Sequence, residues 1–366
     1  MPLQKWCYHK FYTLIRDRFV PFVAALIVPE LVLGWAIRHW FMTGEIVKRR
    51  PNRGLTRKHA FFISMGGYHQ FQPAIPGALT NPFTDKDEGD IGKPCGPVDV
   101  DDIFELLDTG ALWLPTEMEI EDRSKSDWIA KSIVLLQILW FIVQCIARKL
   151  GNLPLSELEV VTLSYTVINL AIYIAWWDKP QNVTWPVPLF HDVRSEWRGR
   201  IRWWVEALAL LGFRYNTPLS AMRRTPTFYF GHSPKEWRGV KHGVEFAAAF
   251  LTVIVGSVFG AVHLLAWSSP FPTATMLHWW RYSSIALTVS PVVVLLGTMT
   301  VIKYLEKSGP LWARIWGFPC FLALIAGLLA YVIGRATTLI LAFRTLNSLP
   351  PEAFRTVRWT DLFPHI

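Results

Sequence analysis

WGFPCFLALIAGLLAYVIGRATTLILAF, residues Trp316 to Phe343, is a continuous apolar stretch with one charged residue, Arg335. A helix needs about 20 mostly apolar residues to cross the hydrocarbon core of a bilayer, and this stretch is long enough. Five other stretches meet the same criterion: Phe19 to Met42, Trp128 to Ala147, Leu155 to Trp177, Gly243 to Trp267 and Tyr282 to Ile302. The sequence therefore predicts an all-α fold, a polytopic transmembrane helical bundle of about six spans.

The composition of the whole chain supports this prediction. Of the 366 residues, 52% are hydrophobic and only 18% are charged, and the mean hydropathy is +0.27. Soluble domains usually carry about a quarter charged residues, so a large soluble protein is a poor alternative. The 19 Trp and 23 Phe fit a protein with aromatic belts at the membrane–water interface. Four cysteines, two of them (Cys145 and Cys320) inside apolar stretches, indicate neither a disulfide framework nor a zinc site.

Basic residues indicate an orientation in the membrane. The net charge is +9, and Lys and Arg gather beside the apolar stretches, which favours lipid headgroups over nucleic acid as partners. They are most frequent in the two long loops, residues 43–127 and 178–242, which we expect to be cytoplasmic. With six spans in one membrane domain over residues 1–366, both termini are then non-cytoplasmic. The sequon Asn182-Val183-Thr184 falls in a cytoplasmic loop and should stay unmodified, in an endomembrane or plasma-membrane protein.

Several motifs are spread along most of the chain: VPELVLGWAIRHW (Val28 to Trp40), HAFFISMGGY (His59 to Tyr68), SKSDWIAK (Ser124 to Lys131), LPLSELEVVTLSY (Leu153 to Tyr165), AWWDKP (Ala175 to Pro180) and SLPPEAFRTVRW (Ser348 to Trp359). On these motifs the chain resembles a family of fungal multi-pass membrane proteins of unknown activity. The resemblance implies the fold and a fungal source, and it brings no activity or cofactor with it. Many relatives have a further hydrophobic segment before the PEL motif, which would make seven spans.

Ionisable residues inside apolar spans are candidates for function, because each costs roughly 2.5–3.5 kcal/mol to insert. Glu30 lies near the middle of the first predicted span and could donate a proton in catalysis; the alternative is a structural ion pair with Arg335. His263, in the fourth span, is a second candidate acid or base. Its alternative role is a hydrogen bond across the bundle. Glu245 lies at the opposite end of that span.

Polar residues also follow one face of two consecutive spans. Gln137 and Gln144 are seven residues apart in the second span, and Thr162, Thr166, Asn169 and Tyr173 recur at helical spacing in the third. These faces could line a polar ligand-binding cavity or only bond to each other. Gly256 and Gly260, four residues apart in the fourth span, predict close packing of helix backbones.

The first long loop contains two acidic patterns. Asp99, Asp101 and Asp102 have the spacing of a polyene-protonating acid motif, but we interpret Asp102 as starting or capping a short helix over Asp101 to Leu107. An acidic cluster with two interleaved cations follows, in which the carboxylates either bind a divalent metal or pair with those cations; its residues are Glu117, Glu119, Glu121, Asp122, Arg123, Lys125 and Asp127. We favour pairing. His191, Asp192 and His232 lack zinc-site spacing, so no metal site is predicted.

Two functions compete at this level. The first is a membrane-embedded enzyme that acts on a lipophilic small molecule, such as a lipid, a terpenoid or another secondary metabolite, with Glu30 or His263 as the acid. The second is a receptor-like or scaffold protein that binds partners through its cytoplasmic loops. A transporter or channel is less favoured, because the sequence has no internal repeat. The cofactor and the oligomeric state stay open.

Overall fold

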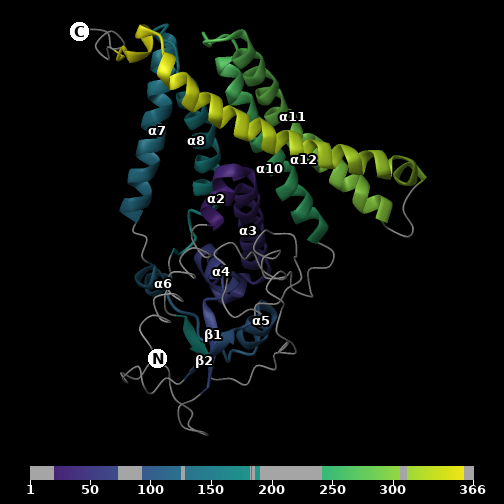
Figure 1. The fold of residues 1–366 in the computed structure, drawn as a ribbon. Helices are drawn as coiled ribbons and strands as arrows, with labels where there is room; N and C mark the ends of the chain where they lie inside the picture. The colour runs from purple at the N-terminus through teal and green to yellow at the C-terminus, as the bar shows by residue number, and fades with distance from the viewer. Residues whose placement is uncertain are drawn as a thin grey trace, which may run out of the picture. The chain divides into compact units, whose positions relative to one another are not determined.

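The computed structural model (Figure 1) describes residues 20–72, 93–124, 128–181, 183, 186–189, 241–305 and 311–357. The chain separates into two compact units, each described by itself below. Unit 1 comprises Met1–Leu33, Ser132–Tyr173 and Ala249–Ile366, and unit 2 comprises Gly34–Lys131 and Ile174–Ala248. The single membrane domain expected from the sequence stays a prediction.

Five helices in the described part of the chain are long and apolar enough to cross a membrane. They are α7 (Trp128–Leu150), α8 (Glu157–Ala175), α10 (Lys241–Val262, extended by the 3-10 turn η6, His263–Ala266), α11 (Ala274–Leu305) and α12 (Leu311–Thr345). Each coincides with one of the predicted spans. The expectation of a mostly helical fold with several membrane-length helices is therefore confirmed.

These helices leave most of their apolar surface uncovered by protein. Only 11% of the most apolar window of α7 and 17% of that of α12 is buried. Large side chains such as Leu136, Leu329 and Ile333 stay exposed. Exposing apolar surface to water costs about 25 cal/mol per Å² of free energy. Helices with these exposed side chains are therefore favoured in the hydrocarbon of a membrane over water. This pattern fits an integral membrane protein.

The predicted first span is divided into two helices. α2 (Val20–Ile27) ends before Val28, and α3 begins at Pro29 and continues to Arg49. Proline has no amide hydrogen and disfavours helical geometry in the residue before it, which explains a break at this point. The break leaves the carbonyl of Leu26 free to accept a hydrogen bond from the hydroxyl of Tyr165. The expectation of one helix over Phe19 to Met42, with Glu30 near its middle, is therefore corrected: Glu30 is the second residue of a helix.

Close backbone contact holds α10 against α11 in unit 1. A Cβ atom added at Gly260 would lie 2.4 Å from the amide nitrogen of Thr288 and 2.5 Å from the carbonyl carbon of Leu287. Only glycine allows this approach, so the packing role predicted for Gly260 is confirmed. Beside this contact, Trp280 and Ala266 are buried in an apolar cluster with residues of α8 and α12.

The start of α8 is fixed by a pair of residues with the Ser-x-x-Glu spacing, Ser156 and Glu159. The Ser156 amide and hydroxyl donate to Oε2 of Glu159, at 2.8 and 3.0 Å, and the Glu159 amide donates to Oγ of Ser156 at 3.2 Å. This is the reciprocal capping box that the spacing of the two residues indicates.

Unit 2 contains short elements within the predicted loop over residues 43–127. Among the described residues these include α4 (Arg57–Ser64), α5 (Val100–Asp108) and α6 (Glu117–Arg123), of which only α5 was expected from the sequence. β1 (Tyr68–Gln72) is the centre of a three-stranded sheet, antiparallel to β2 (Lys93–Pro97) and parallel to β3 (Val187–Leu189). The short helix expected over Asp101 to Leu107 is confirmed as α5. The expectation that Asp102 starts or caps it is wrong, because the helix begins at Val100 with Asp99 at its N-cap position, which leaves Asp102 inside the first turn.

An arginine joins the end of α3 to the end of α5. Nε and Nη2 of Arg50 donate to the two carboxylate oxygens of Asp108, at 3.4 and 3.2 Å, and its guanidinium lies 4.0 Å from the ring centre of Phe104. Nη2 of Arg53 donates to the backbone oxygen of Asp108 at 2.6 Å. These contacts fix the end of α3 against α5 within unit 2. Several residues named in the sequence analysis lie outside the described residues, among them Lys125, Asp127, Asn182, His191, Asp192 and His232.

Candidate functional site

Unit 1 holds a group of buried polar side chains among its apolar helices. We call Glu30, Tyr165, His263, Tyr331 and Arg335 the Glu30 cluster. Glu30, His263, Tyr331 and Arg335 are 8%, 0%, 7% and 1% exposed. They come from α3, η6 and α12, so three separate elements bring together both of the catalytic candidates and the arginine singled out from the sequence.

Glu30 has one bound and one unbound carboxyl oxygen. Tyr331 donates a hydrogen bond from its hydroxyl to Oε2 of Glu30. Oε1 is buried and has no hydrogen-bond partner among the described residues. A carboxyl group in this state can carry a proton on Oε1 while Tyr331 holds Oε2 in place.

Two neighbouring aromatic rings and one histidine contact the guanidinium of Arg335. Its guanidinium carbon lies 4.2 Å from the ring centre of Tyr165 and 4.7 Å from that of Phe259, so aromatic rings compensate part of its charge. Nη1 lies 3.5 Å from Nε2 of His263. Nε and Nη2 are buried, and the part of the chain that the structure describes offers them no hydrogen-bond acceptor.

The contacts of His263 fix the position of its hydrogen. Nδ1 lies 3.0 Å from the carbonyl oxygen of Phe259, which can only accept, so Nδ1 carries the hydrogen. Nε2 is then the acceptor for Nη1 of Arg335. The carbonyl oxygen of His263 accepts from Nε1 of Trp280 at 3.1 Å. This arrangement makes His263 a neutral positioning residue for Arg335, which differs from the acid role considered above.

Glu30 and Arg335 share the cluster, but each has another partner. The partner of Glu30 is Tyr331, and the partner of Arg335 is His263. The direct ion pair expected from the sequence is therefore not the contact that either group makes. Both instead keep unbound polar atoms: Oε1 on Glu30, and Nε and Nη2 on Arg335.

The other predicted site residues are not part of this cluster. Gln137 and Asn169 are exposed and Gln144 is half-buried. Thr162 and Thr166 donate to carbonyl oxygens of their own helix, those of Leu158 and Thr162. The polar stripes therefore give no sign of a shared cavity. Glu245 belongs to α10, but its side chain lies outside the described residues.

Tyr165, Phe259 and Tyr331 were missed in the sequence. A signal was present for two of them, because Phe259 precedes His263 by four residues and Tyr331 precedes Arg335 by four. Residues at this spacing are neighbours on a helix surface. Tyr165 is joined to the cluster by tertiary packing alone, and no spacing in the sequence indicates it.

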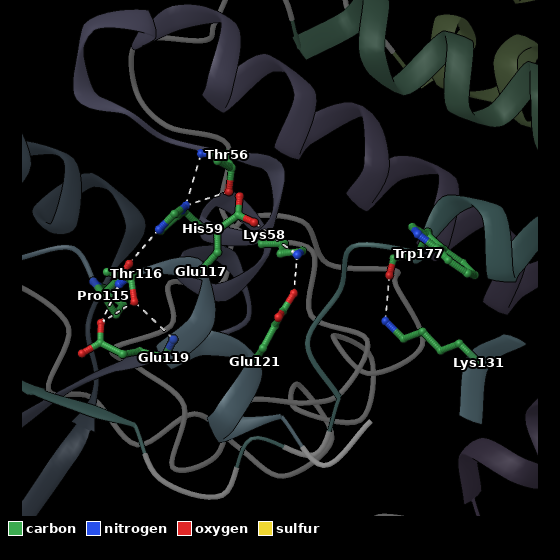
Figure 2. A network of polar contacts seen from close by, with 10 residues as sticks. All are labelled: Thr56, Lys58, His59, Pro115, Thr116, Glu117, Glu119, Glu121, Lys131 and Trp177. Atoms are coloured by element: carbon green, nitrogen blue, oxygen red, sulfur yellow. Dashed lines mark hydrogen bonds and ion pairs between the residues drawn. The ribbon is translucent and has the colours of Figure 1, made fainter. Parts of the chain in front are cut away.

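The acidic cluster of the first loop is neutralised by a lysine from another helix (Figure 2). Nζ of Lys58 donates to Glu121 and, at 3.2 Å, to Oε2 of Glu117. The bond to Glu121 raises the pKa of Lys58, and a hydrogen bond with Thr56, followed by Lys58, lowers the pKa of Glu117. Among the described residues, no group of three or more His, Cys, Asp or Glu side chains could hold a metal ion. The favoured interpretation, pairing, holds for these two carboxylates, although the partner comes from α4.

His59 connects the starts of α4 and α6. Nδ1 of His59 accepts from the amide of Thr56 at 3.2 Å, and Nε2 lies 2.7 Å from the carbonyl oxygen of Pro115, the residue before Thr116. Thr116 and Glu119 form the capping box of α6, with the Thr116 amide donating to Oε2 of Glu119 at 2.6 Å. These contacts are structural and shape the exposed part of unit 2.

The described part of the chain is mostly helical, with five helices of membrane-crossing length and a buried cluster of ionisable groups beside a helix break. A family model described as a family of unknown function, DUF8562, matches residues 105–198. That region contains α6, α7, α8 and β3, and it does not include Glu30, His263 or Arg335. No curated protein and no solved structure matches the chain.

Proposed function

We propose that this chain is an integral membrane enzyme that transfers a proton to or from a lipophilic small molecule, with Glu30 as the acid or base. One observation carries the proposal: Oε1 of Glu30 is buried and has no hydrogen-bond partner among the residues that the structure describes, while Tyr331 fixes Oε2. The fungal origin implied by the sequence motifs and the cytoplasmic placement of both long loops are parts of the same proposal.

The cost of the arrangement supports a functional role. A buried polar atom without a hydrogen bond destabilises a fold by about 1–3 kcal/mol, and more when the group is charged. The Glu30 cluster contains three such atoms, on Glu30 and Arg335. Selection for stability alone would favour apolar side chains here. A ligand that supplies the missing partners would offset this cost.

The break between α2 and α3 lies directly beside Glu30 and supports a role of this residue in ligand binding. Non-helical backbone at membrane depth is tolerated where it is buried in protein or lines a cavity. α3 starts at Pro29, so the amide groups of its first turn lie beside the carboxyl group and favour negative charge there. Glu30 can therefore pass between its charged and neutral forms without losing all of its stabilising contacts.

The chemistry follows from these positions. In the acid direction, the proton moves from Oε1 of Glu30 to a basic atom of the substrate, and the carboxylate left behind keeps its bond from Tyr331. In the base direction the same atom accepts the proton. Arg335, held by Tyr165 and Phe259, would stabilise negative charge that develops on the substrate.

A carrier is the second candidate, favoured by the break between α2 and α3. In several transporter folds the ends of discontinuous helices point at the bound substrate. α2 and α3 are divided in a comparable way. A scaffold role through the acidic segment is less supported, because Glu117 and Glu121 are already paired with Lys58. An enzyme and a carrier differ in whether the small molecule leaves chemically changed.

The test is deletion of the gene followed by untargeted metabolite and lipid profiling, with complementation by wild type, Glu30→Gln and Glu352→Gln. Glu352 is an exposed glutamate at the far end of unit 1 and serves as the matched control. We expect one lipophilic product to disappear, its precursor to accumulate, and only Glu30→Gln to fail at normal abundance. Restoration by Glu30→Gln would sink the role of Glu30. A compound that changes compartment without changing in total amount would favour the carrier, and an unchanged profile would favour the scaffold.

A further inference from the structure

Arg335 presents an unused pair of donors. Nε–H and the neighbouring N–H of Nη2 point the same way from one edge of a planar guanidinium, at the spacing of the two oxygens of a carboxylate. Both nitrogens are buried and lack a partner among the described residues, on a side chain that is 1% exposed. The edge is therefore a two-donor site inside the apolar helices.

This edge is held in a fixed orientation. The neighbouring rings of Tyr165 and Phe259 contact the guanidinium, and Nη1 lies 3.5 Å from Nε2 of His263. His263 is itself fixed through the carbonyl oxygen of Phe259. A guanidinium constrained at this many points loses little conformational freedom when it binds an anion, so its affinity benefits from preorganisation.

We propose that the Nε and Nη2 edge of Arg335 binds the carboxylate of an amphipathic acid, and that Glu30 takes up one proton when this carboxylate binds. The inference rests on the proposed function, since it names the substrate class of the same site. The acid group is chosen by the two parallel donors. The apolar tail follows from the surroundings, because helices with exposed apolar faces enclose the cluster and a ligand would reach it from hydrocarbon.

The net charge of the occupied site explains why Glu30 should take up a proton when the ligand binds. The charged groups of the Glu30 cluster are Glu30 and Arg335, from α3 and α12, which cancel when both are ionised. The other titratable groups near Glu30 are Tyr331 of α12 and Tyr165 of α8, while α10 meets it with Gly256. His263 of η6 contacts Arg335. Adding a carboxylate leaves one negative charge in a medium of low dielectric, which is costly.

Protonation of Glu30 removes that excess. One proton joins Oε1, Oε2 keeps the bond from Tyr331, and the carboxylate of the ligand remains paired with Arg335. The new Oε1–H can donate a third hydrogen bond to the ligand. The same final state results when the ligand arrives as a neutral acid and passes its proton to Glu30, so no other reactant is needed.

The experiment measures binding of hexadecanoate to the purified full chain in detergent, with hexadecanol and acetate as competitors. Hexadecanoate should bind, hexadecanol should compete poorly because it lacks the second oxygen, and acetate should compete poorly because it lacks the tail. Arg335→Gln and Arg335→Lys should each weaken binding by about tenfold or more, since both remove the two-donor edge. Arg281→Gln is the matched control, because Arg281 donates to the carbonyl of Trp267, outside the cluster.

The variant Glu30→Gln tests whether Glu30 takes up a proton when the ligand binds. Glutamine is neutral at every pH, so this variant should bind hexadecanoate at least as tightly as wild type and without proton uptake. Wild type should take up about one proton per ligand bound in weakly buffered solution. Loss of hexadecanoate binding in Glu30→Gln would overturn the proton coupling.

Equal competition by hexadecanol, or unchanged binding in Arg335→Gln, would overturn the acid proposal itself. The competition between acid and alcohol uses wild type only, so it remains decisive if an Arg335 variant fails to fold. If hexadecanoate does not bind but Glu30→Gln still fails to complement the deletion, the proposed function stands and the substrate class is wrong. If hexadecanoate binds as expected and Glu30→Gln complements fully, the binding site stands without the enzyme.

Discussion

Nε2 of His263 lies 3.5 Å from Nη1 of Arg335, and this contact assigns the imidazole the role of acceptor. A histidine in an apolar span suggests acid–base chemistry when it is read from sequence, because imidazole titrates near neutral pH. Here Nδ1 already donates to the carbonyl oxygen of Phe259. Both ring nitrogens of His263 are therefore engaged in hydrogen bonds, and the ring orients Arg335.

Replacing His263 by Phe should lower the stability of the protein. The change removes the acceptor of Nη1 and leaves a further buried donor on Arg335, which costs about 1–3 kcal/mol. Thermal unfolding in detergent would show this as a lower midpoint. His263→Gln, which keeps a side-chain acceptor, is the control and should lose less. An unchanged midpoint in His263→Phe would show that the contact has no energetic role.

Gly260→Ala should be far more damaging than Gly256→Ala. The added methyl group at Gly260 meets the backbone of α11 at 2.4–2.5 Å, which cannot move without separating the helices. At Gly256 it meets Cγ of Glu30 at 3.0 Å and Cγ of Pro291 at 3.5 Å, so a side chain can shift. Overpacking typically costs about 1–3 kcal/mol, and Gly260→Ala should lie at or above the upper end.

Thermal unfolding and monodispersity of the two purified variants would check this order. Gly327→Ala, whose methyl group meets a side-chain carbon of Val293 at 3.2 Å, is a third member of the series and should resemble Gly256→Ala. Equal stability of Gly260→Ala and wild type would contradict the close approach of α10 and α11.

Much of the fold could be predicted from the sequence, because hydrophobic length is a strong and local signal. Five of the predicted spans coincide with apolar helices, and the capping box of Ser156 and Glu159 lies where the spacing places it. The prediction of a single helix for the first span was wrong. Hydropathy is averaged over many residues, so it does not detect the break that Pro29 causes. The small sheet was missed because β1, YHQFQ, and β2, KPCGP, have little strand character of their own.

The candidate site was only partly predictable. Glu30, His263 and Arg335 stand out because they are ionisable residues in apolar surroundings. Their partners do not stand out, because tyrosine and phenylalanine are common in such helices. Whether Glu30 meets Arg335 directly or through neighbours depends on the placement of α3 against α12, which no local pattern contains.

Arg148 should protect the C-terminal segment from proteolysis. Its guanidinium donates to the carbonyl oxygens of Pro154, Ala353 and Arg355, at 2.9, 2.9 and 3.0 Å, and so joins the end of α7 to η8 (Pro351–Phe354). The shorter glutamine side chain of Arg148→Gln cannot donate to all three carbonyl oxygens. Trypsin should therefore cut after Arg355 several-fold faster in this variant than in wild type, as followed by mass spectrometry. Arg344→Gln is the control, and equal cleavage rates would rule out the clamp.

Lys179 should make stability depend on pH. Burial lowers the pKa of Lys179 to about 7 from an ordinary value near 10.5, although its ammonium group lies 3.9 Å from the ring centre of Trp176. Between these values the unfolded chain binds more protons than the folded one, so stability rises as the pH rises from about 7 to about 10. Lys179→Met should reduce this slope and raise the unfolding midpoint at pH 7.

Unfolding midpoints of wild type and Lys179→Met across that pH range give the comparison. Lys149→Met is the control: Lys149 is an exposed lysine of α7, so its removal takes away one positive charge without removing the buried ammonium group. A wild-type curve that falls between pH 7 and 10, or an identical slope in Lys179→Met, would contradict the assignment.

Glycosylation mapping should place both termini on the non-cytoplasmic side. α7, α8, α10, α11 and α12 are long and apolar enough to cross the membrane. The prediction of six spans adds a sixth crossing by α2 and the start of α3. An even number puts the two ends on one side, and the basic loops put that side away from the cytoplasm. Acceptor sequons added at either end should therefore be modified, and Asn182 should not. Modification at the C-terminal end alone would mean that α2 and α3 do not cross, and modification of Asn182 would reverse the orientation.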